Sequence, residues 1–111
     1  METTTPTPQT KPSIPVLPRE RLMSALSNEA RLIILNELCN GEPLGVVDFA
    51  PKTGLTLPAT SKHCAVLAAL GIIVRGRGNL YRLAPAFQPA PGTRTIDFGH
   101  CLLRLDWQSA T

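Results

Sequence analysis

Apolar residues follow helical spacing in the first half of the chain. Within residues 19–26, Leu22, Met23 and Leu26 recur at intervals that bring them close together on one side of a helix. Residues 28–38 are apolar over most of the circumference that a helix would present, which is typical of a buried helix. The pattern therefore predicts two consecutive helices near the N-terminal end of the folded region.

Capping residues and prolines indicate where these helices begin and end. Ser27 stands where it stops the first helix and caps the second. Pro43 occupies a position that the first turn of a third helix tolerates, and residues 44–50 are predicted to form that short helix. Pro51 is expected to limit how far it continues.

The segment from Thr56 to Gly71 has the signals of a fourth helix. Thr56 is a suitable N-cap and Gly71 a suitable stop. Between them, Thr60, Cys64 and Leu67 recur at intervals of four and three residues. We expect this stripe to face the core and the other sides of the helix to be largely exposed.

A small hairpin follows directly. Residues 72–75 and 80–83 are rich in side chains that favour β-strands. Residues 76–79 between them include the Gly and Asn residues that favour a turn. Two short helices followed by a basic hairpin are the order of a winged helix-turn-helix. The predicted fold class is mainly α with a small β-hairpin wing.

The pattern changes again on either side of a domain expected at residues 19–83. Residues 1–18 are rich in Thr and Pro and are predicted to be a disordered arm. Residues 84–92 read as a Pro and Ala linker. Residues 93–107 show alternation with period two, which predicts one C-terminal strand, and residues 108–111 are left as a tail.

Charge adds a functional indication to this pattern. The net charge is only +3, but no Asp or Glu occurs between Phe49 and Ile96. The basic residues of this window are Lys52, Lys62, Arg75, Arg77, Arg82 and Arg94. One sign of charge concentrated on one block of sequence favours a polyanionic partner such as nucleic acid.

Three stretches of the chain carry a resemblance to a known family. They are ALSNEARLIILNEL from Ala25, GLTLPATSKHCAVLAALGIIV from Gly54 and GNLYRL from Gly78, in the order and spacing of the ArsR-type winged helix-turn-helix regulators. The match extends from about Leu22 to Leu83. The resemblance implies a homodimeric transcription repressor whose effector weakens its hold on an operator.

This sequence departs from the family pattern at two places. Where many relatives carry Gln, Ser and Thr at the start of the recognition helix, this chain has Leu57, Pro58 and Ala59, which contact bases only through apolar groups. The thiolate pair that relatives carry on the third helix falls at Gly45 and Val47. We therefore expect no metal site of the family type.

The candidate DNA-binding residues come from the fourth helix and the hairpin. Ser61, Lys62 and His63 stand where the family shows Ser-Arg-His, and Arg75 and Arg77 flank a glycine tip that suits the minor groove. The predicted set is Thr56, Pro58, Ala59, Ser61, Lys62, His63, Arg75, Arg77, Asn79 and Tyr81. Tyr81 is equally able to pack on the core.

Dimerisation is expected to use the first helix and the C-terminal strand, whose apolar side chains have no obvious partner in so small a sheet. The predicted residues are Leu22, Met23, Leu26, Ile96, Phe98 and Leu102. A two-fold dimer would place its recognition helices about 34 Å apart on an inverted-repeat site.

Other classes of function find little support. No nucleophile–His–carboxylate set or phosphate loop is present, so we expect neither an enzyme nor a bound cofactor. Three widely separated cysteines fit reduced thiols, and the absence of a signal peptide or long apolar run predicts a cytoplasmic protein without membrane contact. Asp97 and His100 lie on opposite faces of a strand, which disfavours joint metal binding.

Two alternative functions remain open from the sequence. The domain could serve as a protein-docking module that presents Leu57, Pro58 and Ala59 as an apolar face. It could also be a DNA-binding repressor that responds to thiol oxidation.

Overall fold

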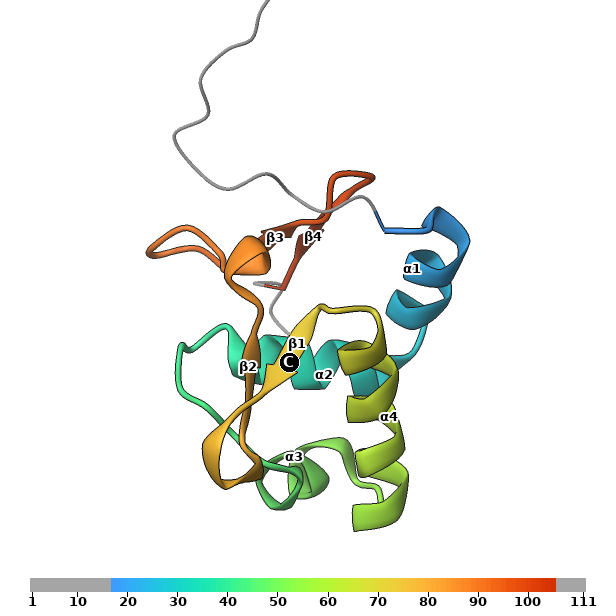
Figure 1. The fold of residues 1–111 in the computed structure, drawn as a ribbon, viewed down its shortest axis with the longest axis vertical. Helices are drawn as coiled ribbons and strands as arrows, with labels where there is room; N and C mark the ends of the chain where they lie inside the picture. Colours follow the sequence, from blue (N-terminus) through green and yellow to red (C-terminus); the bar gives the residue numbers. More distant parts are fainter. Residues whose placement is uncertain (1–16, 106–111) are drawn as a thin grey trace, which may run out of the picture.

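The computed structural model describes residues 17–105. Four helices precede two small antiparallel β-hairpins (Figure 1). The helices are α1 (Arg19–Leu26), α2 (Glu29–Leu38), α3 (Val46–Thr53) and α4 (Leu57–Ala69). The strands are β1 (Ile73–Arg75), β2 (Tyr81–Leu83), β3 (Thr95–Asp97) and β4 (Leu102–Arg104), with single 3₁₀ turns η1 (Arg77–Asn79) and η2 (Pro85–Phe87). The mainly helical fold with a β-hairpin wing is confirmed.

The junction between α1 and α2 is close to the prediction, with one correction at the cap. Asn28, and not Ser27, caps α2, because its Oδ1 accepts a hydrogen bond from the Arg31 backbone N–H at 3.2 Å. The Ser27 hydroxyl instead donates to the Ser24 carbonyl at 2.8 Å and closes α1. Each of the two polar residues therefore serves a different helix end.

The helix α3 begins later and ends later than expected. Leu44 is not part of the helix, because its backbone pairs with that of Tyr81. The Leu44 N–H donates to the Tyr81 carbonyl at 3.0 Å, and the Leu44 carbonyl accepts from the Tyr81 N–H at 2.7 Å. Pro51 lies inside the helix without ending it. In so short a helix proline removes a single backbone hydrogen bond, and the Gly54 N–H donates to the Ala50 carbonyl at 2.9 Å to complete the last turn.

The helix α4 matches its predicted pattern. The Thr56 hydroxyl caps it by accepting the Ala59 N–H at 3.2 Å. Thr60, Cys64 and Leu67 are fully buried, as the stripe predicted. Their burial against α2 and α3 orients the opposite face of α4 toward solvent.

The wing hairpin is anchored on the core by alternate residues of its second strand. Tyr81 and Leu83 are buried while Arg82 between them is exposed. At the tip, Gly78 has a φ of 73° and Asn79 a φ of 61°, both in the left-handed region that turns the chain back.

The C-terminal region differs from the single strand that was predicted. It forms the hairpin β3–β4, which turns at Gly99, where φ is 88° and the N–H donates to the Asp97 carboxylate at 2.8 Å. Alternation with period two continues through a hairpin, so it did not reveal the turn.

The segment expected as a linker is packed against this hairpin. Phe87 in η2 is 1% exposed, and its ring centroid lies 5.2 Å from that of Phe98. Phe98 is itself fully buried. The linker and the C-terminal hairpin thus extend the hydrophobic core to which α1 and α2 also contribute.

Some predictions lie outside the described residues. These are most of the arm at residues 1–18, of which only Leu17 and Pro18 are described, the last two residues of the strand expected at 93–107, and the tail at residues 108–111. Leu17 is buried, and its carbonyl lies 2.8 Å from the His100 imidazole.

Candidate nucleic-acid interface

The N-terminal half of α4 presents its short polar face to solvent. Ser61 and Lys62 are exposed, as is Pro58, while Ala59 is half-buried. Thr56 is exposed, but its hydroxyl is occupied as the N-cap, which leaves backbone N–H groups of the first turn to meet an anion. The helix therefore offers one hydroxyl and one ammonium group beside a positive helix end.

His63 is less accessible than Ser61 and Lys62, the two residues that precede it on α4. Burial lowers the pKa of His63 below its usual range, and the positive charge of Arg31 lowers it further. The imidazole is therefore neutral at pH 7 and can take part as a hydrogen-bonding group without adding charge.

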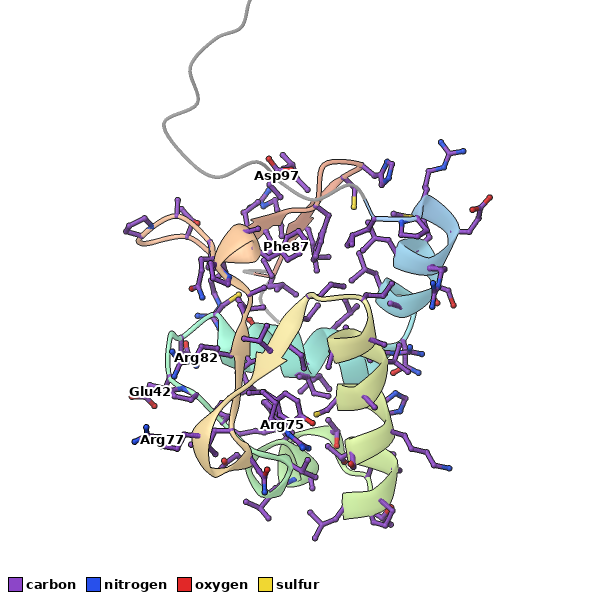
Figure 2. All side chains as sticks on the ribbon, in the orientation of Figure 1. Glu42, Arg75, Arg77, Arg82, Phe87 and Asp97 are labelled. Carbon is purple, nitrogen blue, oxygen red and sulfur yellow. The ribbon has the colours of Figure 1, made fainter. Side chains whose placement is uncertain are left out.

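The wing carries its arginines on two sides. Arg75 and Tyr81 are directly opposite in the β1–β2 ladder and share one face of the hairpin, whereas Arg82 pairs with Val74 on the other face. Arg77 projects outward from the tip in Figure 2. Arg75, Arg77 and Asn79 are all exposed.

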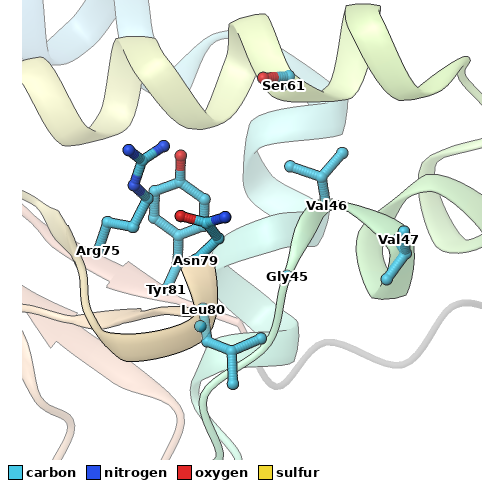
Figure 3. A pocket seen from close by; sticks show the side chains of 9 residues that line it. Gly45, Val46, Val47, Ser61, Arg75, Asn79, Leu80 and Tyr81 are labelled. Atoms are coloured by element: carbon cyan, nitrogen blue, oxygen red, sulfur yellow. The ribbon is translucent and has the colours of Figure 1, made fainter.

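A crevice of about 370 Å³ separates the wing from α4 and from the start of α3. Its lining includes Val46 and Val47 of α3, Ser61 of α4, and Arg75, Asn79 and Tyr81 of the wing. In Figure 3 the Tyr81 hydroxyl and the Arg75 guanidinium point from the wing toward α4. Ser61, Arg75 and Asn79, predicted from separate parts of the sequence, therefore meet at one place.

The sequence left Tyr81 open between a contact with DNA and packing on the core, and it gave no indication of the contribution of α3. Tyr81 is only 6% exposed, because its ring packs in the core and leaves the hydroxyl end at the crevice. Val46 and Val47 reach the crevice because Gly45 caps α3, with its N–H donating to Asp48 Oδ2 at 2.8 Å. The Gly–x–x–Asp spacing is a helix-start signal that could have located this helix end.

The basic window is not a single surface. The Arg94 side chain donates hydrogen bonds to Asn36 and Asn40 at the end of α2, so it serves the fold. Of the other basic residues of the window, Arg75 lines the crevice. The exposed residues outside its lining are Lys52 on α3, Lys62 on α4, and Arg77 and Arg82 on the wing.

Apolar side chains are also exposed around the start of the two helix-turn-helix helices. Val47 is 67% exposed, Leu57 49% and Leu55 39%. Leu57 precedes Pro58 at the first turn of α4, the region that a major groove would receive.

The residues predicted for dimerisation divide into two groups. Leu22, Ile96 and Phe98 are fully buried within one chain, so the expectation that they form a surface for a second chain is not met. They belong to the hydrophobic core that the C-terminal hairpin extends. The remaining three are accessible to differing degrees: Met23 and Leu102 are exposed, and Leu26 is half-buried.

The described residues contain no group of three or more His, Cys, Asp or Glu side chains that could hold a metal ion. Gly45 and Val47 occupy the positions of the family thiolates and have no donor side chain. No helix between residues 17 and 105 is long and apolar enough to cross a bilayer.

Comparisons with known proteins agree with this geometry. The chain is 41% identical over 64 residues to the HTH-type transcriptional regulator NmtR of Mycobacterium tuberculosis, a match covering 55% of this chain and 52% of the relative. It superposes on HlyU from Vibrio cholerae with a TM-score of 0.52 and 30% identity, over 60% of this chain and 74% of HlyU. The chain belongs to the ArsR-type winged helix-turn-helix regulators. No protein-family model matches it.

A further structural neighbour is Mb0332 from Mycobacterium bovis. Its structure is that of a homodimeric winged helix-turn-helix DNA-binding domain, described as a possible ArsR-family transcriptional regulator. The TM-score is 0.52 and the identity 32%, over 60% of this chain and 63% of that domain. The chain spans about half the length of the curated relative it matches.

Proposed function

We propose that this ArsR-type chain is a DNA-binding transcriptional repressor that acts as a homodimer on an inverted-repeat operator. The observation that carries the proposal is the meeting of Ser61, Arg75 and Asn79 at one crevice between α4 and the wing. No acidic residue falls in the sequence from α4 to the end of the wing. A helix and a hairpin that present only neutral and basic groups suit a phosphate-lined partner.

The binding mode follows from the exposed groups. The N-terminal half of α4 would enter the major groove, with Ser61 and Lys62 at base edges or phosphates and Leu57 against thymine methyl groups. Arg77 at the wing tip would insert in the adjacent minor groove, whose negative potential rewards a guanidinium. The role is binding in the cytoplasm, with no reaction catalysed and no cofactor held.

Dimerisation would use the accessible members of the predicted set. Met23 and Leu102 present apolar surface on α1 and β4, and Leu26, on the same helix as Met23, is partly exposed. A two-fold arrangement would repeat the helix–wing unit about one helical turn of DNA apart.

Selection of bound sites from a random duplex pool tests this proposal. The expected product is an inverted repeat whose half-site centres lie about 34 Å, or a multiple of that distance, apart. Lys62→Ala should weaken retention of the selected duplex, while Lys52→Ala, which removes an exposed charge from the last turn of α3 and not from α4 or the wing, should weaken it less. Failure to enrich any sequence, with no retention of random duplex at micromolar protein and low salt, would refute the proposal.

The exposed apolar side chains support one alternative, a protein-docking role for the same surface. Val47, Leu55 and Leu57 are 67%, 39% and 49% exposed around the start of α3 and α4. In that case the duplex would not be retained in the low-salt experiment.

A further inference from the structure

The Tyr81 hydroxyl is the polar end of a side chain that is otherwise buried, and that end reaches the crevice. The residue is 6% exposed, and its side chain forms no hydrogen bond with another residue of the described range. The hydroxyl points into the crevice between the wing and α4, so its hydrogen-bonding capacity is available to a group that occupies the crevice (Figure 3).

The groups around the hydroxyl are donors of hydrogen bonds. The Arg75 guanidinium stands directly across the β1–β2 ladder from Tyr81 and has no ion pair with another described residue. Asn79 and Ser61 add an amide and a hydroxyl, and none of the crevice-lining residues is acidic. The arrangement suits an acceptor with several oxygens and negative charge.

The start of α3 closes the crevice on its third side. Val46 and Val47 line it, and as the first two residues of the eight-residue helix they have backbone N–H groups without an intrahelical partner. The positive end of the α3 dipole adds to the charge of Arg75. Asp48 faces this helix end but is engaged with the Gly45 N–H and does not line the crevice.

We propose that this crevice is an oxyanion site that takes a phosphate group, bound by Arg75 and Ser61 and oriented by the Tyr81 hydroxyl. Its volume of about 370 Å³, against about 30 Å³ for one water in the liquid, leaves room for a phosphate and the sugar or small group attached to it. The phosphate is supplied either by the DNA backbone or by a free phosphate compound. The DNA source rests on the proposed function, whereas the free anion does not.

The first arm of the test uses inorganic phosphate and the full chain without DNA. Amide resonances of Val46, Val47 and Ser61 should shift with phosphate, at constant ionic strength set with chloride. Tyr81→Phe and Arg75→Gln should each weaken the apparent affinity about tenfold, as expected for loss of a hydrogen bond to a charged group. Arg82→Gln is the matched control, because it removes an arginine from the other face of the same hairpin.

The second arm measures duplex binding by the same variants. Tyr81→Phe should lower affinity about tenfold for all duplex sequences alike and leave the salt dependence unchanged, since no charge is lost. Arg75→Gln should lower affinity and also reduce the slope of log affinity against log salt by about 0.9. Thermal unfolding of each variant serves to separate a binding effect from a folding effect.

The outcomes separate the two proposals. Phosphate-dependent shifts that Tyr81→Phe weakens establish the oxyanion site even if no duplex is bound. Weaker duplex binding by Tyr81→Phe at unchanged melting temperature, without shifts from free phosphate, assigns the site to the DNA backbone. If phosphate shifts nothing and Tyr81→Phe binds duplex as the wild type does, the oxyanion site is refuted while DNA binding stands.

Discussion

The Arg94 Nε donates a hydrogen bond to Asn36 Oδ1 at 2.9 Å and joins the C-terminal hairpin to α2 across 58 positions of sequence. A second nitrogen of the same guanidinium donates to Asn40 Oδ1 at 2.9 Å, and a third to the Asn36 carbonyl. One guanidinium group thus donates three hydrogen bonds to polar groups at the C-terminal end of α2. The helix dipole favours positive charge at that end.

Removing this side chain should loosen the hairpin. Arg94→Met is expected to lower the free energy of unfolding by about 1–3 kcal/mol, because charged hydrogen bonds are lost and their acceptors are left without them. Hydrogen exchange should report faster exchange of the Leu105 amide, which donates to the Arg94 carbonyl at 2.8 Å. Arg82→Met, at an exposed wing position, is the control and should change stability by less than about 0.5 kcal/mol. Equal stability of the two variants would contradict a stabilising role for the hydrogen bonds of Arg94.

The parts of the fold that could be predicted are those that local periodicity encodes. The stripe of Thr60, Cys64 and Leu67 and the Thr56 cap follow from spacing within one helix. The corrections all come from contacts between distant segments. Leu44 pairs with Tyr81 and leaves α3, and Phe87 packs on Phe98 and turns an expected linker into core.

The candidate site could be predicted to a similar extent. Ser61, Arg75 and Asn79 were identified by residue type and by position on the fourth helix or hairpin, and the structure brings them to one crevice. The part played by the start of α3 could not be inferred, since it depends on how α3 packs beside the wing. Alternation also could not tell which apolar residues face a partner chain, because Leu102 is exposed while Ile96 is buried.

Acidification should destabilise the fold through His63. Its pKa is lowered in the folded protein, first by burial and then by Arg31, so the unfolded chain binds the proton more tightly. The free energy of unfolding should therefore fall as the pH drops below the unfolded pKa of about 6.5, until it levels off below the folded pKa.

Proton NMR of the His63 ring measures this directly. Its pKa should lie below that of a histidine in an unstructured peptide. Arg31→Gln should raise it only part of the way, because burial is the larger cause. An unshifted His63, or a full return to the peptide value in Arg31→Gln, would contradict this assignment.

The buried thiols should be poor redox sensors. Burial raises the pKa of Cys64 to about 11, so about one thiol in a thousand is ionised at pH 8. Burial also raises the pKa of Cys39, although Arg94 opposes the shift. Native protein should therefore react slowly with a thiol reagent at both cysteines, and urea should speed the reaction of both.

A DNA-binding measurement decides whether oxidation matters. Peroxide treatment of Cys101→Ser should leave its affinity for duplex unchanged, because Cys39 and Cys64 are the thiols that remain. A loss of affinity that a reducing agent restores would instead support the thiol-responsive alternative.

Leu102 should contribute to self-association. It is 66% exposed on β4, and Leu102→Glu should shift the chain toward monomer in analytical ultracentrifugation, because a charge would be buried at the interface. Val74→Glu, which alters a 39% exposed apolar residue on the wing, is the matched control. A monomeric wild type, or equal association of both variants, would contradict this surface.

The most direct test of the DNA-binding surface is the salt dependence of duplex affinity. Log affinity should fall linearly with log salt, and Lys62→Ala and Arg77→Ala should each reduce the slope by about 0.9, the value for one phosphate contact. Lys52→Ala, in the last turn of α3 and not on α4 or the wing, should reduce it less. Affinity that does not depend on salt, or slopes that neither Lys62→Ala nor Arg77→Ala changes, would contradict the assignment of α4 and the wing as the surface that binds DNA.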